Sequence, residues 1–160
     1  MPITYEPIAT NTLGSAAASV TFSTISGSYT DLVLVFAGSI TSGFDAINMQ
    51  FNGDTGTTYS RTILVGNGTT ASSSRDSTAS SIQIGIMGTD QSNTIWNVMN
   101  YANITTYKTV LSRGNSASNS VRANVGLWRN TAAITSIILT AASSTFISGS
   151  TFTLYGIKAA

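Results

Sequence analysis

Residues 51–60 read FNGDTGTTYS, and they separate two segments in which apolar and polar residues alternate. The segment before them, AINMQF (46–51), ends in Phe51, and the segment after them, YSRTILV (59–65), begins with Tyr59. Alternation with a period of two is typical of a half-buried β-strand. Asn, Gly and Asp between two such segments indicate a turn, because Gly accepts positive φ and Asp side chains bond nearby backbone amides. We therefore expect Asp54 to shape a turn between two strands.

The same kind of segment recurs along the chain. Ten of them occupy residues 19–25, 31–38, 46–51, 59–65, 81–87, 94–102, 107–114, 121–130, 135–140 and 151–157. In the eighth, VRANVGLWRN, the apolar positions are Val121, Ala123, Val125 and Leu127. Clusters of Gly, Asn, Asp and Ser separate the segments, and no segment has a convincing helical period. The pattern predicts an all-β, single-domain antiparallel β-sandwich that is jelly-roll-like, with a closed β-barrel as the alternative.

Two parts of the chain fall outside this pattern. Residues 1–12 include two prolines, which favour an extended conformation, so we expect an N-terminal arm (1–12) ahead of a sandwich domain (13–160). Ile3, Tyr5 and Ile8 of this arm are expected to lie in a groove on a partner or to add to a sheet edge. A frayed terminus is the alternative. The Ser-rich residues 69–81 are expected to form a mobile loop.

Charged residues are scarce. They make up 8% of the chain, against about 25% in an average soluble domain, while Ser and Thr supply 49 of the 160 residues. With a mean hydropathy of +0.20, an isolated subunit of this kind would associate readily, so we expect sister subunits or a larger assembly to cover much of its surface. A soluble monomer coated with hydroxyl groups is the alternative. The net charge of +1 predicts no nucleic-acid partner, and the absence of a long apolar run predicts no membrane partner.

The side-chain inventory argues against an enzyme. There is no His and no Cys, which removes the Ser-His-Asp and Cys-His nucleophile systems. Asp54, Thr55 and Gly56 form the tripeptide of aspartic proteases, but those enzymes need a second aspartate, and turn residues precede Asp54 here. Oxygens of Asn52, Asp54 and Thr55 could contact Ca²⁺, yet the nearest other acid, Asp45, is nine residues away. We expect no catalytic residue, no metal and no cofactor.

Two tryptophans stand beside polar residues. Proteins that bind glycans often stack an aromatic ring on the sugar and surround it with Asn, Asp and Arg, and both Trp96 and Trp128 have such neighbours. Large aromatic residues on alternating strands more often belong to a core or a subunit interface. Because Trp and Arg are enriched in interface hot spots, we expect Trp128 and Arg129 to anchor a partner.

Several segments together resemble a family of virion structural proteins of tailed bacteriophages. They are FNGDTGTTYS (51–60), YKTVLSRGN (107–115), VGLWRNTAAITSI (125–137) and GSTFTLYGIKAA (149–160), and residues 5–35 fit the same pattern. The resemblance spans nearly the whole chain. It implies a small β-rich structural protein of the phage head or tail, and it supplies no catalytic residues.

The resemblance implies two alternative roles. A capsid decoration (cement) protein binds, usually as a homotrimer, to the outside of the shell formed by the major capsid protein and stabilises it. A tail or fibre protein would instead bind a host surface receptor or glycan. The compact length, without coiled-coil heptads or a fibrous stem, favours decoration. Since the N-terminus lacks the pattern of a signal peptide, we expect synthesis in the host cytoplasm and a final location on the capsid surface of the virion.

Overall fold

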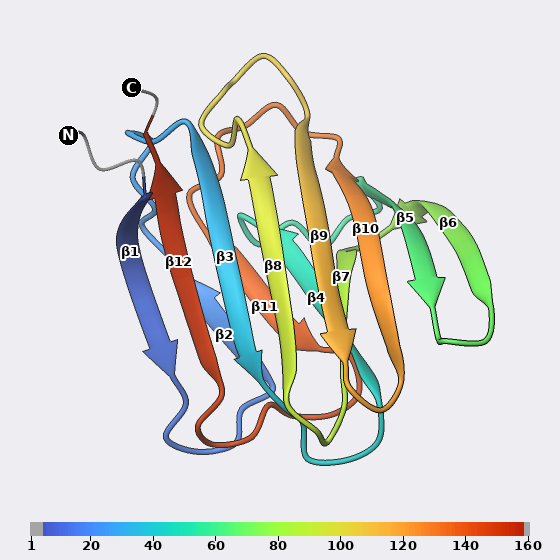
Figure 1. Cartoon of the computed structure of the whole chain (residues 1–160). Helices are drawn as coiled ribbons and strands as arrows, with labels where there is room; N and C mark the ends of the chain where they lie inside the picture. The colour runs from blue at the N-terminus through green and yellow to red at the C-terminus, as the bar shows by residue number, and fades with distance from the viewer. Residues whose placement is uncertain (1–4, 159–160) are drawn as a thin grey trace.

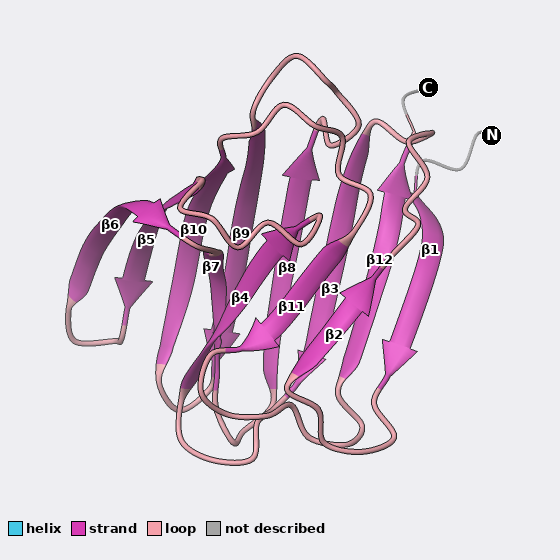
Figure 2. Ribbon diagram, turned by 180° about the vertical axis from the view of Figure 1, so that it is seen from behind, coloured by secondary structure: helices cyan, strands magenta, loops and turns pink. Residues whose placement is uncertain are grey.

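The computed structural model describes residues 5–158, which form a sandwich of two antiparallel β-sheets without helices (Figure 1). The large sheet has eight strands in the order β1-β12-β3-β8-β9-β10-β5-β6, and the small sheet has four in the order β2-β11-β4-β7. Seen from behind, the small sheet lies across the large one, and β5 and β6 project beyond it (Figure 2). The all-β, jelly-roll-like sandwich is confirmed. The closed barrel is wrong, because each sheet ends in edge strands that pair on one side only within the described residues.

The strands account for most of the chain. The large sheet contains β1 (Tyr5–Thr12), β3 (Asp31–Gly38), β5 (Tyr59–Gly66), β6 (Ala71–Ala79), β8 (Ser92–Met99), β9 (Lys108–Ser116), β10 (Ser120–Trp128) and β12 (Thr151–Ile157). The small sheet contains β2 (Ser19–Phe22), β4 (Asp45–Phe51), β7 (Ile82–Met87) and β11 (Ile137–Ala141). Each of the ten segments with a two-residue period corresponds to one of these strands.

Two strands, β1 and β6, were not among the ten expected from the alternating segments. The Ser-rich residues 69–81 are not a loop for most of their length, because Ala71–Ala79 pairs with β5. From Tyr5 onward the expected arm is extended, but it pairs with the chain's own β12 as an edge strand. Pro7 fits there because the register shifts between Pro7 and Ala9, and a missing N–H on an edge strand costs little. Ile3 lies outside the described residues.

The core lies between the inner sides of the two sheets. In β4, the side chains of Ile47, Met49 and Phe51 point inward and are fully buried, as the alternation in the sequence predicts. In β3, Leu32 and Leu34 do the same from the large sheet. Burial of an apolar side chain of this size contributes about 1.5–3 kcal/mol. Inward alternation from both sheets therefore supplies the main free energy that holds the layers together.

Buried aromatic residues add hydrogen bonds across the layers. The indole N–H of Trp96 on β8 donates to the carbonyl oxygen of Ile84 on β7 at 2.7 Å, which joins the large sheet to the small one. The hydroxyl of Tyr101 donates to the carbonyl oxygen of Ser26 and accepts the backbone N–H of Tyr29. These bonds satisfy polar groups that would otherwise be costly to bury.

The two sheets approach closely where a glycine of one faces an isoleucine of the other. Gly126 lies on the inner side of β10, and a Cβ at this position would overlap the side chain of Ile82 on β7. We predict that Gly126→Ala lowers the free energy of unfolding by roughly 1–3 kcal/mol, because the close-packed core cannot take up the extra methyl group. The double variant with Ile82→Ala should lose less stability than the sum of the two single variants.

Urea denaturation followed by circular dichroism measures these effects. Gly66→Ala is the matched control, because a Cβ there would meet only an ordinary contact with Val121 at 3.5 Å. If Gly126→Ala were as harmless as Gly66→Ala, the close approach of the two sheets at this point would be contradicted.

Candidate functional site

The Asp-Thr-Gly motif lies in the connection that crosses from β4 of the small sheet to β5 of the large sheet. Oδ1 of Asp54 accepts the backbone N–H of Gly56 at 2.9 Å. Its Oδ2 accepts the hydroxyl of Thr58 and the indole N–H of Trp128, each at 2.7 Å. Asp54 therefore shapes the turn, as the sequence indicated, and also ties it to the end of β10.

These donors determine the electrostatics of the carboxylate. The hydrogen bond from Trp128, helped by those from Thr58 and Gly56, holds the pKa of Asp54 below its usual value. Across residues 5–158, no group of three or more Asp and Glu side chains is arranged to hold a metal ion. The carboxylate at the centre of the motif is thus used by the fold itself.

The aromatic residues around Asp54 form one buried cluster. The hydroxyl of Tyr59 donates to the carbonyl oxygen of Asp54 and accepts the backbone N–H of Phe51, both at 3.0 Å. Burial raises the pKa of Tyr59 to about 12. The rings of Phe51 and Trp128 have centroids 5.5 Å apart, and Trp128 is only 1% exposed. The expectation that Trp128 anchors a partner is therefore wrong, because its ring belongs to the core.

The other residues expected to bind a partner do not converge on one site. Arg129 is half-buried and donates from its guanidinium to the carbonyl oxygen of Thr57 at 2.7 Å, which again braces the β4–β5 connection. Ile8 on β1 packs partly buried against the core. Tyr5, also on β1, is 58% exposed, and β1 lies five strands away from β10 in the large sheet. Trp96, the other aromatic residue considered for a glycan, is fully buried.

The outer side of the large sheet, which faces away from the small sheet, is unexpectedly apolar. Directly opposed residues in antiparallel strands point to the same side of a sheet, so the registers assign residues to this side. One row across the sheet consists of Val35, Ile95, Arg113, Ala123 and Leu64, and the next consists of Val33, Asn97, Leu111, Val125 and Thr62. We call this surface the outer face and define it by these two rows together with Val121 and Leu127.

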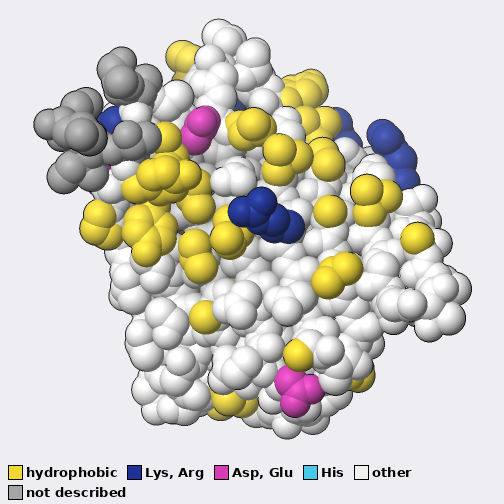
Figure 3. Space-filling view, in the orientation of Figure 1, with side chains coloured by type: hydrophobic (Ala, Val, Ile, Leu, Met, Phe, Trp, Pro, Cys, Tyr) yellow, Lys and Arg dark blue, Asp and Glu magenta, His cyan; other side chains and the backbone are white. Residues whose placement is uncertain are grey.

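Several apolar side chains of the outer face are open to solvent. Val121 is 62% exposed, Leu64 55% and Val125 49%. Figure 3 shows the hydrophobic side chains gathered over the upper half of this side of the molecule, with a basic side chain among them. The apolar positions of β10 therefore point outward, whereas Asn124 and Trp128 point into the core.

The outer side of the small sheet has the opposite character. The registers place Ser19, Thr21, Asn48, Gln50, Gln83, Ile138 and Thr140 on this side, which we call the polar face. A polar outer side is what an antiparallel sheet in water normally presents. The outer face of the large sheet departs from that rule, because several of its apolar side chains are exposed.

Arg113 is the charged residue in the two rows that define the outer face, and Asp31 lies on the same side of the sheet near its edge. Arg113 lies in the middle of its row, between Ile95 and Ala123, and is exposed. Its guanidinium forms no hydrogen bond or ion pair with any residue that the structure describes. Arg75 lies on the same side of the sheet, opposite Thr62 on β5. A complementary surface would be apolar and would present a carboxylate to Arg113.

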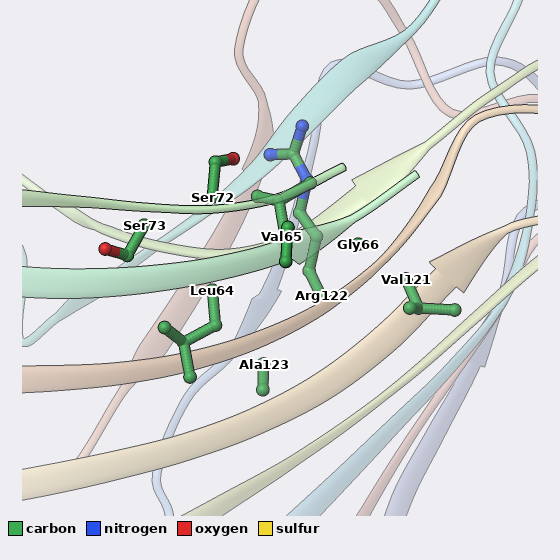
Figure 4. Close-up of a pocket in the computed structure, with 9 residues that line it drawn as sticks. Leu64, Val65, Gly66, Ser72, Ser73, Val121, Arg122 and Ala123 are labelled. Atoms are coloured by element: carbon green, nitrogen blue, oxygen red, sulfur yellow. The ribbon is translucent and has the colours of Figure 1, made fainter. Parts of the chain in front are cut away.

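A hollow of about 630 Å³ opens where β5, β6 and β10 lie together, at the end of the outer face. In Figure 4, Leu64 and Ala123 point to one side of the strands, and Arg122 and Ser72 point to the other. Val121 lies beside them. The lining is mostly aliphatic, so the hollow is suited to receive apolar groups rather than a polar substrate.

Comparisons with known proteins do not identify a family. No model of a known protein family and no curated protein matches the sequence. Solved structures with a weak likeness to this chain include an exo-inulinase and an alginate lyase. The exo-inulinase from Aspergillus awamori has a TM-score of 0.46 and 12% identity over 96% of this chain, which spans 29% of the inulinase chain. The alginate lyase Aly36B in complex with an alginate tetrasaccharide has a TM-score of 0.38 and 9% identity over 92% of this chain and 77% of the lyase chain. Likenesses of this size carry no argument about activity or substrate.

The Asp54 turn yields a prediction about stability. Asp54→Ala removes three hydrogen bonds and leaves the buried indole N–H of Trp128 without an acceptor, so we expect the free energy of unfolding to fall by roughly 1–3 kcal/mol. Asp54→Asn keeps an acceptor oxygen and should cost less. Asp90→Ala is the control, since this exposed loop carboxylate forms no side-chain bond within the described part of the chain. An equal effect of Asp54→Ala and Asp90→Ala in urea melts would contradict the role of Asp54.

The same carboxylate predicts how stability changes with pH. Because the pKa of Asp54 is lower in the folded protein than its ordinary value of 3.8, the ionised group contributes its full stability above that value. The contribution is lost as the pH falls through the folded-state pKa. The difference in unfolding free energy between wild type and Asp54→Asn should therefore shrink on acidification from neutral pH to below about pH 4. A difference that stays constant with pH would count against this assignment.

Proposed function

We propose that this chain is a non-enzymatic structural protein of a bacteriophage virion, and more specifically a capsid decoration protein. In this role it binds the outside of the assembled shell of major capsid protein through its outer face. The resemblance of the sequence to phage virion proteins suggests the setting. The observation that supports it is the contrast between the apolar outer face and the polar face on the opposite side of the molecule.

This contrast determines how the protein would be oriented on the shell. An apolar sheet surface gains about 25 cal/mol for each Å² removed from water, so the outer face is the side that gains from contact with a shell. The polar face, with Thr21, Asn48 and Gln50, is suited to remain in solvent. With the outer face covered, the scarcity of charge on the chain no longer opposes solubility.

Arg113 adds specificity to this contact. Covering an arginine without a partner leaves a desolvated charge, which costs several kcal/mol. The shell surface that receives the outer face must therefore place a carboxylate near Arg113. Tyr5 extends the same surface at the other end of the sheet, because it pairs with Ile157 and points to the outer side. Among the N-terminal residues that were expected to bind a partner, we assign this role only to Tyr5.

Such binding would strengthen the shell by mass action. A protein that binds the assembled shell but not its free subunits adds its binding free energy to the stability of the assembly. Many weak sites repeated over the shell act together, so each contact needs only modest affinity. The alternative is a tail protein that binds a host receptor or glycan, and the two rings considered for stacking on a sugar, those of Trp96 and Trp128, are buried.

The test uses particles of the phage that encodes this chain, with its gene deleted. Purified particles should release their DNA at a lower temperature than wild-type particles, and added protein should restore the wild-type temperature. Val125→Asp on the outer face should fail to co-sediment with the particles and fail to restore them. Thr21→Asp on the polar face is the matched control and should behave like wild type.

Two outcomes would contradict the proposal. Particles without the protein that resist heat normally but no longer adsorb to cells would show a tail protein. Loss of particle binding by Thr21→Asp but not by Val125→Asp would show that the polar face is the docking side. Thermal melts of both variants confirm that each is folded before binding is compared.

A further inference from the structure

Four strands form the edges of the two sheets, and three of them are protected. Exposed edges invite pairing with other strands, and proteins protect them with proline, bulges or short length. In β1, Pro7 and the adjacent register shift interrupt the edge. In β2 there are only four residues. β7 is six residues long, and its pairing with β4 has a register shift between Ile47 and Asn48.

The fourth edge strand, β6, has a register shift only near its end, where its pairing with β5 is irregular between Tyr59 and Arg61. Its nine residues contain no proline, and Ala71 through Asp76 pair with β5 in an unbroken register. On its other side β6 pairs with no strand of the described chain. Figures 1 and 2 show that β5 and β6 project beyond the small sheet, so this edge is open from both sides. Alternate backbone N–H and C=O groups along β6 are therefore available to another strand.

We propose that β6 is a dimerisation edge, on which β6 of a second copy of this chain pairs antiparallel and joins the two large sheets into one. A two-fold axis makes any strand edge complementary to itself, because each residue meets the same partner from both copies. With the axis at Ser73, the pairing places Ser73 opposite Ser73, Ser72 opposite Ser74, and Ala71 opposite Arg75. No pair in this register puts like charges directly opposite each other.

The hollow beside β6 supports a second copy as the occupant. Ala71, Ser73 and Arg75 all point to the outer side, because they oppose Gly66, Leu64 and Thr62 on β5 in an unbroken register. Ala71 lies at the hollow that Leu64, Val121 and Ala123 line. The proposed register therefore brings Arg75 of the second copy to the aliphatic side of this hollow, while Arg122 and Ser72 line it from the other side of the strands. The methylene groups of the incoming Arg75 can pack there while its guanidinium stays in solvent.

The two-fold relation fills both hollows at once. Ala71, which lies at the hollow, is four residues from Arg75 on β6. A two-fold axis at Ser73, halfway between them, therefore places Arg75 of each copy at the hollow of the other. Arg75 forms no hydrogen bond or ion pair with another residue in the described part of the chain, so it is available for this contact.

This pairing goes beyond the decoration role, and it covers the outer face only at the hollow lined by Leu64, Val121 and Ala123. Two copies joined at β6 present their outer faces side by side, so a dimer would bind a repetitive surface through two linked contacts. A two-fold edge contact closes at two copies. It would thus form dimers and not the homotrimer that the sequence resemblance implies.

The absence of cysteine from the chain allows a direct test of the register. Ser73→Cys places one thiol on each side of the two-fold axis, directly opposite its counterpart, so mild oxidation of the dilute protein should give a disulfide-linked dimer. Ser77→Cys is the matched control, because this residue is also exposed on β6 but is not opposite itself in the proposed register. Efficient cross-linking of Ser73→Cys alone would support the pairing, and equal cross-linking of both variants would overturn it.

Sedimentation equilibrium tests the same edge without a covalent bond. Wild-type protein should approach twice the 16.6 kDa mass of the chain as its concentration rises. Ser73→Lys places two lysines opposite each other and should weaken dimerisation roughly fivefold or more, while Ser77→Lys should not. A monomeric or trimeric wild type would overturn the proposal, as would equal masses for the two variants. This experiment contains no capsid shell. A monomeric result would therefore contradict the β6 dimer without contradicting the proposed decoration role.

Discussion

The position of the two sheets depends on one carboxylate at the crossing between them. Asp54 accepts bonds from its own turn and from the indole of Trp128 at the end of β10, and Tyr59 bonds the backbone on both sides of the turn. The end of β4, the start of β5 and the end of β10 are thereby held together. With this connection fixed, the alternation of apolar and polar residues determines the register of the strands. A slip of one residue would turn every inward side chain of a strand outward. Phe51 and Tyr59 are buried together in this arrangement.

The same alternation gives the two outer sides their different characters. On the small sheet, inward apolar residues alternate with outward Thr, Asn and Gln, as in a sheet that faces water. On β10, the outward positions are apolar as well, and the inward positions contain Asn124, Gly126 and Trp128. A strand with apolar side chains on the side away from the core exposes apolar surface that a binding partner could remove from water. The proposed function follows from that apolar surface and from the unneutralised Arg113 within it.

The sequence predicted the sandwich, ten of the strands and the Asp54 turn, because each of these rests on local periodicity or turn chemistry. It missed β6, whose Ser-rich residues show no alternation since neither side of the strand is covered. It misplaced Trp128, because alternation does not tell a core ring from an exposed one, and the acceptor of its N–H is 74 residues away. It gave no sign that Lys108 is buried, with its ammonium bonded to two carbonyl oxygens of separate connections. In β10 the apolar residues were visible, but only the registers show that they point away from the core.

The copy number of this protein in purified virions is the most direct test of the account. Quantitative mass spectrometry of intact particles, with the major capsid protein as the internal reference, measures it without any variant or assumption about the binding face. A protein that covers the shell through its outer face should be present in copies of the same order as the major capsid protein, in a fixed ratio to it. A ratio that corresponds to a few copies per particle, or absence from the particle, would contradict the account.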